Sequence, residues 1–210
     1  MVVCLSSFPI IKTAVKNSYS VYVVIDPGHG GSDGGAVSKN GLKESSVTLT
    51  VSKRLKKMFL KYGIGVVLTR EKDVSLGNTK RQDMEKRKEI IENVRPAAVI
   101  SVHANTFSYS YRRGAQVFYW GENGKILAEC VQSNINIRIN SVYSGKNYSA
   151  LTGDYYILKC TDAPSCIVEC GFLSNPKDEQ LLQDTTYIDE LCFAVFSGTI
   201  AYLQKNEINV

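Results

Sequence analysis

Short, continuous runs of β-branched and other apolar residues alternate along this chain with segments whose apolar residues recur at helical spacing. This alternation restricts the fold more than any other feature, because strands that are apolar on both faces need helices on both sides of their sheet. The runs predict strands over residues 21–25, 65–68, 97–102, 114–119, 155–158 and 165–170. The helical spacing predicts helices over residues 44–62, 80–93, 124–139, 175–183 and 186–203. We therefore expect a single three-layer α/β domain.

The composition is that of an ordinary globular protein. Of the 210 residues, 44% are hydrophobic and 21% are charged, which excludes a disordered chain, and this length fits one domain. The formal net charge is +5, but the cations are spread over two expected helices, at residues 53–61 and 80–88. Two solvated helix faces explain this pattern, and weak attraction to an anionic wall polymer or membrane surface is the alternative. We expect no nucleic-acid partner, because no concentrated basic stripe with interleaved aromatic residues is present.

The six cysteines do not form a metal-binding pattern. No two of them have C-x-x-C spacing, which argues against a structural zinc knuckle. We expect most of them to be buried free thiols that pack as small hydrophobic residues. The sequence does not decide whether two of them form a disulfide, and it indicates no pair.

Residues 1–20 differ from the segment at residues 21–210, where the expected strands and helices lie. They are first largely apolar and then polar, and the apolar part is too short to span a bilayer. We interpret them as an N-terminal segment that is either the remnant of an export signal or anchor, or a stretch packed on the domain.

Side chains that commonly bind metals lie at the ends of three expected strands. The chain has two histidines, His29 just after the first strand and His103 at the end of the third, and Glu169 ends the last strand. In open α/β sheets, sites form beyond the carboxyl ends of the strands. Glu44 starts the first expected helix, directly after the glycine-rich loop that carries His29. Because catalytic zinc sites use three protein ligands and leave one position for water, we predict zinc at His29, Glu44 and His103.

Glu169 and Glu44 could each have a purely structural role instead of a role in catalysis or metal binding. A carboxylate at the end of an apolar strand is costly unless it is used, so Glu169 is a candidate general base toward a metal-activated water. The alternative for Glu169 is an ion pair with Arg70 or Arg87, and the alternative for Glu44 is capping of its helix. The glycines of residues 28–41 let the backbone turn sharply. A phosphate-binding loop is excluded there, because neither G-x-x-x-x-G-K-[ST] nor G-x-G-x-x-G is present.

Several segments, in matching order, resemble motifs of the zinc-dependent cell-wall amidases of the amidase-3 family. They are residues 24–31 (VIDPGHGG), 42–44 (LKE), 68–70 (LTR), 100–105 (ISVHAN) and 164–175 (PSCIVECGFLSN). The resemblance implies that His29, Glu44 and His103 bind Zn²⁺ and that Glu169 is the catalytic acid/base. It further implies hydrolysis of the amide between N-acetylmuramic acid and L-alanine in peptidoglycan, by a catalytic domain at residues 21–210. The implied fold is a twisted, mixed six-stranded sheet flanked by helices.

Residues 80–87 (KRQDMEKR) and 114–119 (GAQVFY) are similar, more narrowly, to the germination-specific CwlD-type amidases of spore-forming bacteria. This implies spore cortex as substrate, as a step towards muramic δ-lactam, and an exported protein of the cell wall or cortex. Because the sequence contains no wall-binding repeat, we expect a protein activator, an anchoring partner or an N-terminal membrane anchor. The sequence leaves two alternative roles, orienting the substrate or supporting the sheet, for Arg70, Arg87 and Asn105.

Two other functions remain compatible with the sequence. One is a catalytically silent peptidoglycan-binding domain of the same fold, which the presence of all four site residues disfavours. The other is a zinc hydrolase that acts on another wall amide, such as a carboxypeptidase, because a fold does not fix the substrate.

Overall fold

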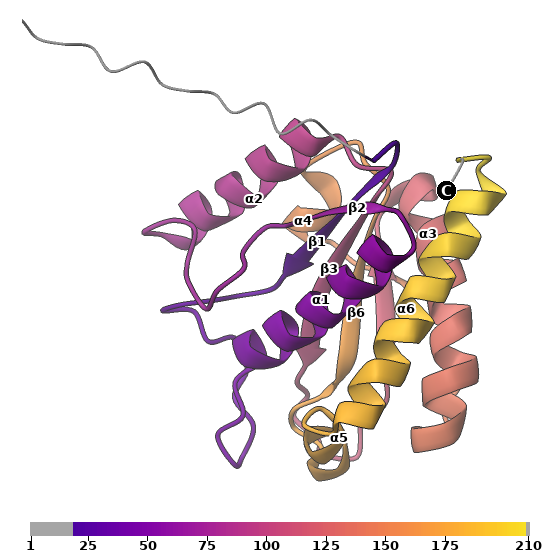
Figure 1. Ribbon diagram of the computed structural model, residues 1–210. Coiled ribbons are helices and arrows are strands. Elements are labelled where there is room, and N and C mark those ends of the chain that lie inside the picture. Colours follow the sequence, from indigo (N-terminus) through magenta and orange to yellow (C-terminus); the bar gives the residue numbers. More distant parts are fainter. Residues whose placement is uncertain (1–18, 209–210) are drawn as a thin grey trace, which may run out of the picture.

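Six strands form one sheet in the order β2-β1-β3-β6-β4-β5 (Figure 1). The strands are β1 (Tyr22–Pro27), β2 (Gly65–Leu68), β3 (Ala98–Asn105), β4 (Gln116–Tyr119), β5 (Leu151–Thr152) and β6 (Ser165–Phe172). In this computed structural model, which describes residues 19–208, neighbouring strands are parallel except for the antiparallel pair of β4 and β6. The sheet is therefore mixed and six-stranded, as the family resemblance implied.

Helices cover both faces of this sheet. They are α1 (Glu44–Lys61), α2 (Lys80–Val94), α3 (Gly121–Ile135), the π-helix η1 (Asn136–Ser144), α4 (Tyr156–Lys159), α5 (Pro176–Leu181) and α6 (Thr185–Lys205). The helices α1, α3 and α6 lie together on one face, while α2 and the short α4 lie on the other (Figure 1). The expected three-layer α/β domain is confirmed.

The strand residues alternate between two hydrophobic clusters, one under each helical layer. In β1, Val23 and Ile25 belong to the larger cluster, on the side of α1 and α6. Val24, between them, belongs to the smaller cluster with Ile91 of α2 and Ile157 of α4. Successive side chains of a strand point to opposite faces, so a strand covered on both sides must be apolar throughout. This explains why residues 21–25 of the β1 segment and residues 97–100 of the β3 segment read as unbroken apolar runs.

The prediction of a strand at residues 155–158 was wrong. Tyr156–Lys159 forms a single helical turn, and the sixth strand is instead the two-residue β5. A four-residue apolar run cannot by itself distinguish a strand from a helix. Here the adjacent residues Ile157 and Leu158 are both buried in the smaller cluster, while Tyr155 is exposed. Burial of two neighbours on one side fits a helical turn and does not fit a strand.

The helix expected at residues 124–139 is longer and changes type. It begins at Gly121 and continues from Asn136 as a π-helix. The side chain of Asn140 donates to the carbonyl of Ala115 and accepts from its amide, both at 2.8 Å, so η1 holds the start of β4. The apolar spacing could not reveal this change of helix type. The remaining expected elements are present, with ends that differ by a few residues.

Five of the six cysteines lie in the described part of the chain, and all five are free thiols. Burial raises the pKa of Cys166 and of Cys192 to about 12, so these thiols are unreactive. Most of the N-terminal segment, including Cys4, lies outside the described residues. Within residues 19–208, none of the helices has the length and apolar character needed to cross a bilayer.

Candidate active site

His29 lies in the turn that follows β1, where the backbone adopts left-handed conformations. The φ angle is 61° at His29, 135° at Gly30 and 61° at Gly31. Glycine adopts such angles without strain, so the two glycines let the chain fold back past the end of the strand. The turn directs the imidazole towards α1, with Nε2 3.2 Å from Oε2 of Glu44. The other ring nitrogen, Nδ1, lies 3.0 Å from Oδ2 of Asp33.

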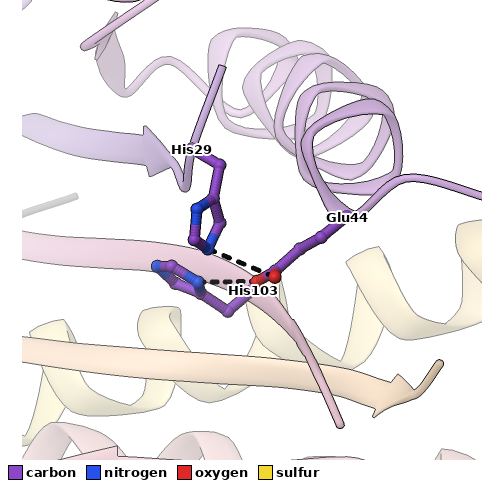
Figure 2. A group of neighbouring side chains, drawn as sticks. All are labelled: His29, Glu44 and His103. Carbon is purple, nitrogen blue, oxygen red and sulfur yellow. Dashed lines mark hydrogen bonds and ion pairs between the residues drawn. The ribbon is translucent and has the colours of Figure 1, made fainter. Parts of the chain in front are cut away.

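Glu44 is the first residue of α1, and its carboxylate contacts both imidazoles (Figure 2). Its Oε1 is 2.8 Å from Nδ1 of His103 and accepts from the amide of Ala104 at 3.1 Å. Its Oε2 faces His29 and accepts from the amide of Ala36 at 2.8 Å. None of these donors belongs to α1, so the helix-capping alternative was wrong. Burial alone would raise the pKa of Glu44, but hydrogen bonds from His103 and His29 hold it well below its ordinary value.

Glu169 of β6 lies beside His103 of β3, because these two residues are register partners in the parallel pair. Glu169 is only 9% exposed, and its Oε2 has no hydrogen-bond partner. Burial raises the pKa of Glu169 to about 7, although the nearby His103 acts in the opposite direction. The alternative of an ion pair with Arg70 or Arg87 was wrong, since both guanidinium groups bind other acceptors.

His29, Glu44 and His103 together form a set that fits a zinc ion. The ligand atoms that they offer lie within 4.8 Å of one another. Two imidazole nitrogens and one carboxylate oxygen are a donor set of catalytic zinc sites. Burial lowers the pKa of His29, but the hydrogen bonds and charges of Glu44 and Asp33 raise it to about 9. The cluster therefore attracts positive charge, and each imidazole faces one carboxylate oxygen of Glu44.

A comparison with protein families identifies the chain. The model of the amidase-3 family, described as N-acetylmuramoyl-L-alanine amidase, matches residues 23–201. This range includes His29, Glu44, His103 and Glu169. The chain belongs to the N-acetylmuramoyl-L-alanine amidase family.

Individual relatives of this amidase are similar over most of its length. The germination-specific N-acetylmuramoyl-L-alanine amidase of Bacillus subtilis (strain 168) is 32% identical over 195 residues, which covers 87% of this chain and 80% of that protein. The probable cell wall amidase LytH of Staphylococcus epidermidis (strain ATCC 35984) is 31% identical, over 87% of this chain but 58% of the relative. The chain thus spans little more than half the length of that second relative.

Solved structures of amidases share the fold. The CwlD amidase from Clostridioides difficile, in complex with the GerS lipoprotein, has a TM-score of 0.83 and 34% identity, and the match covers 88% of this chain and 99% of that one. AmiC2 of Nostoc punctiforme has a TM-score of 0.79 and 34% identity, covering 88% and 97%. These similarities confirm both the family resemblance and the narrower likeness to the germination-specific amidases.

In this amidase, Arg70 and Arg87 support the turn that carries His29. Arg70 donates from Nη2 to the carbonyl of Gly28 at 2.8 Å. Arg87 is 2% exposed, pairs with Asp26 at 2.6 Å and donates from Nη2 to the carbonyl of His29 at 2.8 Å. The Arg70 guanidinium therefore uses its donors on backbone carbonyls and on the hydroxyl of Thr48, whereas the Arg87 guanidinium uses its donors on backbone carbonyls and on carboxylates. The geometry favours support of the sheet for these two residues.

Close contacts also fix His103 and the end of β3. A Cβ atom on Gly28 would lie 2.3 Å from Cε1 of His103, so the ring occupies space that only glycine leaves free. The carbonyl of Asn105 accepts from the amide of Leu173 at 2.7 Å, and its side chain accepts from the amide of Thr106. Asn105 therefore joins β3 to the end of β6 and holds its own strand end.

A cavity opens beside this cluster. Among the residues that line it are His29, Asp33, Met84, His103, Tyr155, Tyr156, Ile157, Ile167 and Glu169. The ring of Tyr155 lies against Gly153, where a Cβ would be 2.4 Å from Cε2, and meets Phe118 edge-on at 5.7 Å between centroids. Sequence reasoning did not single out Tyr155, because its segment was expected to be a strand. It also missed Asp33, whose contact with His29 depends on the left-handed turn.

Proposed function

We propose that this amidase uses zinc to hydrolyse the amide bond between the lactyl group of N-acetylmuramic acid and L-alanine in peptidoglycan. The observation that carries the proposal is the convergence of His29, Glu44 and His103 beside a buried carboxylate oxygen of Glu169 that lacks a partner. Three ligands and a neighbouring base are what a hydrolytic zinc site requires. The bond that is cut follows from membership of the family.

Zinc, when bound, supplies a Lewis acid that lowers the pKa of a coordinated water to about 7 and polarises the carbonyl group of the substrate. Glu169 accepts a proton from the attacking water through its free Oε2, because no donor of the protein occupies that oxygen. The water oxygen bonds to the carbonyl carbon and the carbon–nitrogen bond breaks. Glu169 then passes the proton to the departing amine of L-alanine. A pKa of about 7 suits a group that both takes and returns a proton near neutral pH.

In this proposal, the substrate also contacts cavity-lining residues other than the histidines and Glu169. Tyr155 is 44% exposed, and its ring is held between Gly153 and Phe118. Its hydroxyl group is therefore available to donate a hydrogen bond to a substrate that lies across Glu169. Met84 and Tyr156, from α2 and α4, add apolar surface to the same wall. A mixed wall of this kind fits a ligand with both a sugar and a peptide.

The names of the relatives support a proposal for the location, the substrate and the partner protein of this enzyme. One of them is named as germination-specific, others are named as cell wall amidases, and the solved CwlD structure contains a lipoprotein. We therefore propose that this enzyme is exported to the cell wall or spore cortex, that it acts on cortex peptidoglycan towards muramic δ-lactam, and that a partner protein activates or anchors it.

The test is release of stem peptide from two purified substrates, spore cortex peptidoglycan and vegetative peptidoglycan, with zinc added or chelated. The proposal expects new N-terminal L-alanine only when zinc is present, and faster release from cortex. Release of D-alanine without new N-terminal L-alanine would identify a carboxypeptidase instead. Equal release from both substrates would contradict the cortex preference but not the amidase reaction. If the isolated chain binds zinc but is inactive, addition of a lipoprotein partner should restore release.

A further inference from the structure

Asp33 lies four residues after His29, inside the same turn, and both of its carboxylate oxygens are engaged. Oδ2 is 3.0 Å from Nδ1 of His29, and Oδ1 accepts from the amide of Gly35 at 3.1 Å. Its backbone is fixed too, since Asp33 and Gly30 exchange two hydrogen bonds, at 2.8 and 3.1 Å. The carboxylate is thus held in one place, with one oxygen aimed at the ring of His29.

The two nitrogens of His29 have separate partners. Nδ1 faces Asp33, while Nε2 faces Oε2 of Glu44, on the side where His103 also points. A neutral imidazole carries one hydrogen, and a metal binds only the nitrogen that lacks it. An acceptor at Nδ1 keeps the hydrogen there and leaves the lone pair of Nε2 for the metal.

We propose that Asp33 is a positioning residue of the zinc centre, which accepts the Nδ1 hydrogen of His29 and so presents Nε2 to the ion. The inference rests on the proposed zinc centre and adds to it a residue outside the three ligands. Carboxylates that bind the second nitrogen of a ligating histidine typically change metal affinity by about 10–100-fold.

His103 shows why His29 needs this support. The ring of His103 belongs to a regular strand, lies against Gly28 and directs Nδ1 to Oε1 of Glu44. Packing and the strand fix its orientation. His29 instead lies in a left-handed turn outside the sheet, so the orientation of its ring depends more on the contact with Asp33.

The first experiment measures zinc affinity by competition with a chelator, for wild type, Asp33→Asn, Asp33→Ala and the control Asp73→Asn. Asp73 is a matched control, because its Oδ1 accepts from the amide of Gly31 at 3.0 Å in the same turn but does not contact His29. We expect the two Asp33 variants to bind zinc about 10–100-fold more weakly, and Asp73→Asn to bind it like wild type. Asparagine has one acceptor oxygen for two donors, so Asp33→Asn cannot serve both His29 and Gly35 as the carboxylate does.

The second experiment observes the tautomer directly, by nitrogen-15 NMR of the imidazoles in the zinc-loaded protein. The chain has two histidines, so the spectrum is simple to assign. Wild type should show His29 with its hydrogen on Nδ1, and Asp33→Ala should show a loss of this single state. Circular dichroism of each variant checks that it is folded.

The outcomes separate the two proposals. Wild-type affinity in both Asp33 variants, or an Nε2 hydrogen on His29 in the loaded wild type, would overturn the role of Asp33 and leave the zinc centre intact. Equal weakening by Asp73→Asn would also overturn it, because the effect would then come from general loosening of the turn. Failure of the wild type to bind zinc at all would overturn the zinc centre, and this inference with it.

Discussion

His103 and Glu169 are partners in the parallel ladder between β3 and β6, and the register of the two strands shifts only beyond them, between His103 and Asn105. The proposed zinc ligand and the proposed base therefore lie on adjacent strands, whose separation of about 4.8 Å is set by backbone hydrogen bonds. The spacing between the proposed base and this ligand thus does not depend on a loop. The other two proposed ligands, Glu44 and His29, come from the start of α1 and from the turn after β1.

Replacing Glu169 with glutamine tests the role of the base without changing the shape of the side chain. Glutamine cannot accept the proton, so kcat should fall by about 10²–10⁴-fold while zinc affinity stays near that of wild type. Stem-peptide release and chelator competition measure the two quantities on the same preparation. Loss of zinc binding in parallel with activity would instead make Glu169 a ligand.

Zinc should stabilise the folded protein through His103. An ion that binds only the native state adds about 2.7 kcal/mol to the free energy of unfolding when its concentration is 100 times Kd. Wild type should therefore show a rise in Tm with added zinc, and His103→Ala should show none, because it removes one of three ligands. Calorimetric scans with zinc and with chelator give both values. An unchanged Tm shift in His103→Ala would place the ion elsewhere.

The four proposed site residues could be predicted from the sequence, because a parallel sheet brings the carboxyl ends of its strands to one edge. His29, His103 and Glu169 all follow apolar strands that could be recognised, and Glu44 begins a helix with clear apolar spacing. A pattern of strands was therefore enough to predict that these side chains meet.

Other parts of the site depend on information that no local pattern contains. The turn geometry at His29, with φ of 61°, decides that Asp33 is its partner. The buried pairing of Arg87 with Asp26 joins residues 61 positions apart. Tyr155 lines the cavity because the apolar run that follows it forms a helical turn. A run of four residues could not show in advance whether it forms a helical turn or a strand.

Asp26 gives a prediction for the dependence of stability on pH. Burial alone would raise its pKa, but Arg87, Thr69 and Ser101 lower it below its ordinary value of 3.8. Because the folded pKa is depressed, the ionised carboxylate stabilises the protein above pH 3.8, and this contribution is lost as the pH falls through the folded pKa. At neutral pH, Asp26→Asn should lower the free energy of unfolding by about 3 kcal/mol, since it removes the fully buried carboxylate of the pair and leaves Asp83 as the remaining carboxylate partner of Arg87.

Urea unfolding of wild type and Asp26→Asn over a series of pH values measures this difference directly. It should be constant near neutral pH and shrink in acid, as wild-type Asp26 takes up a proton. Comparison of the two proteins at each pH removes the effect of the other carboxylates. A difference that grows in acid would mean that Asp26 is protonated in the native state.

The last prediction concerns the wall of the cavity. If the hydroxyl group of Tyr155 donates to the substrate, Tyr155→Phe should lower kcat/KM by about 2–10-fold, as expected for the loss of one hydrogen bond of 0.5–1.5 kcal/mol. Tyr109→Phe is the control, because Tyr109 is 62% exposed and does not line the cavity. Gly153→Ala should have a larger effect than Tyr155→Phe, since its Cβ would lie 2.4 Å from the ring of Tyr155 and must displace the whole side chain. Zinc affinity should stay unchanged in all three variants, because none of these residues contacts a ligand atom. If kcat/KM falls in Gly153→Ala but not in Tyr155→Phe, the ring supports the substrate by packing and the hydroxyl group does not bind it.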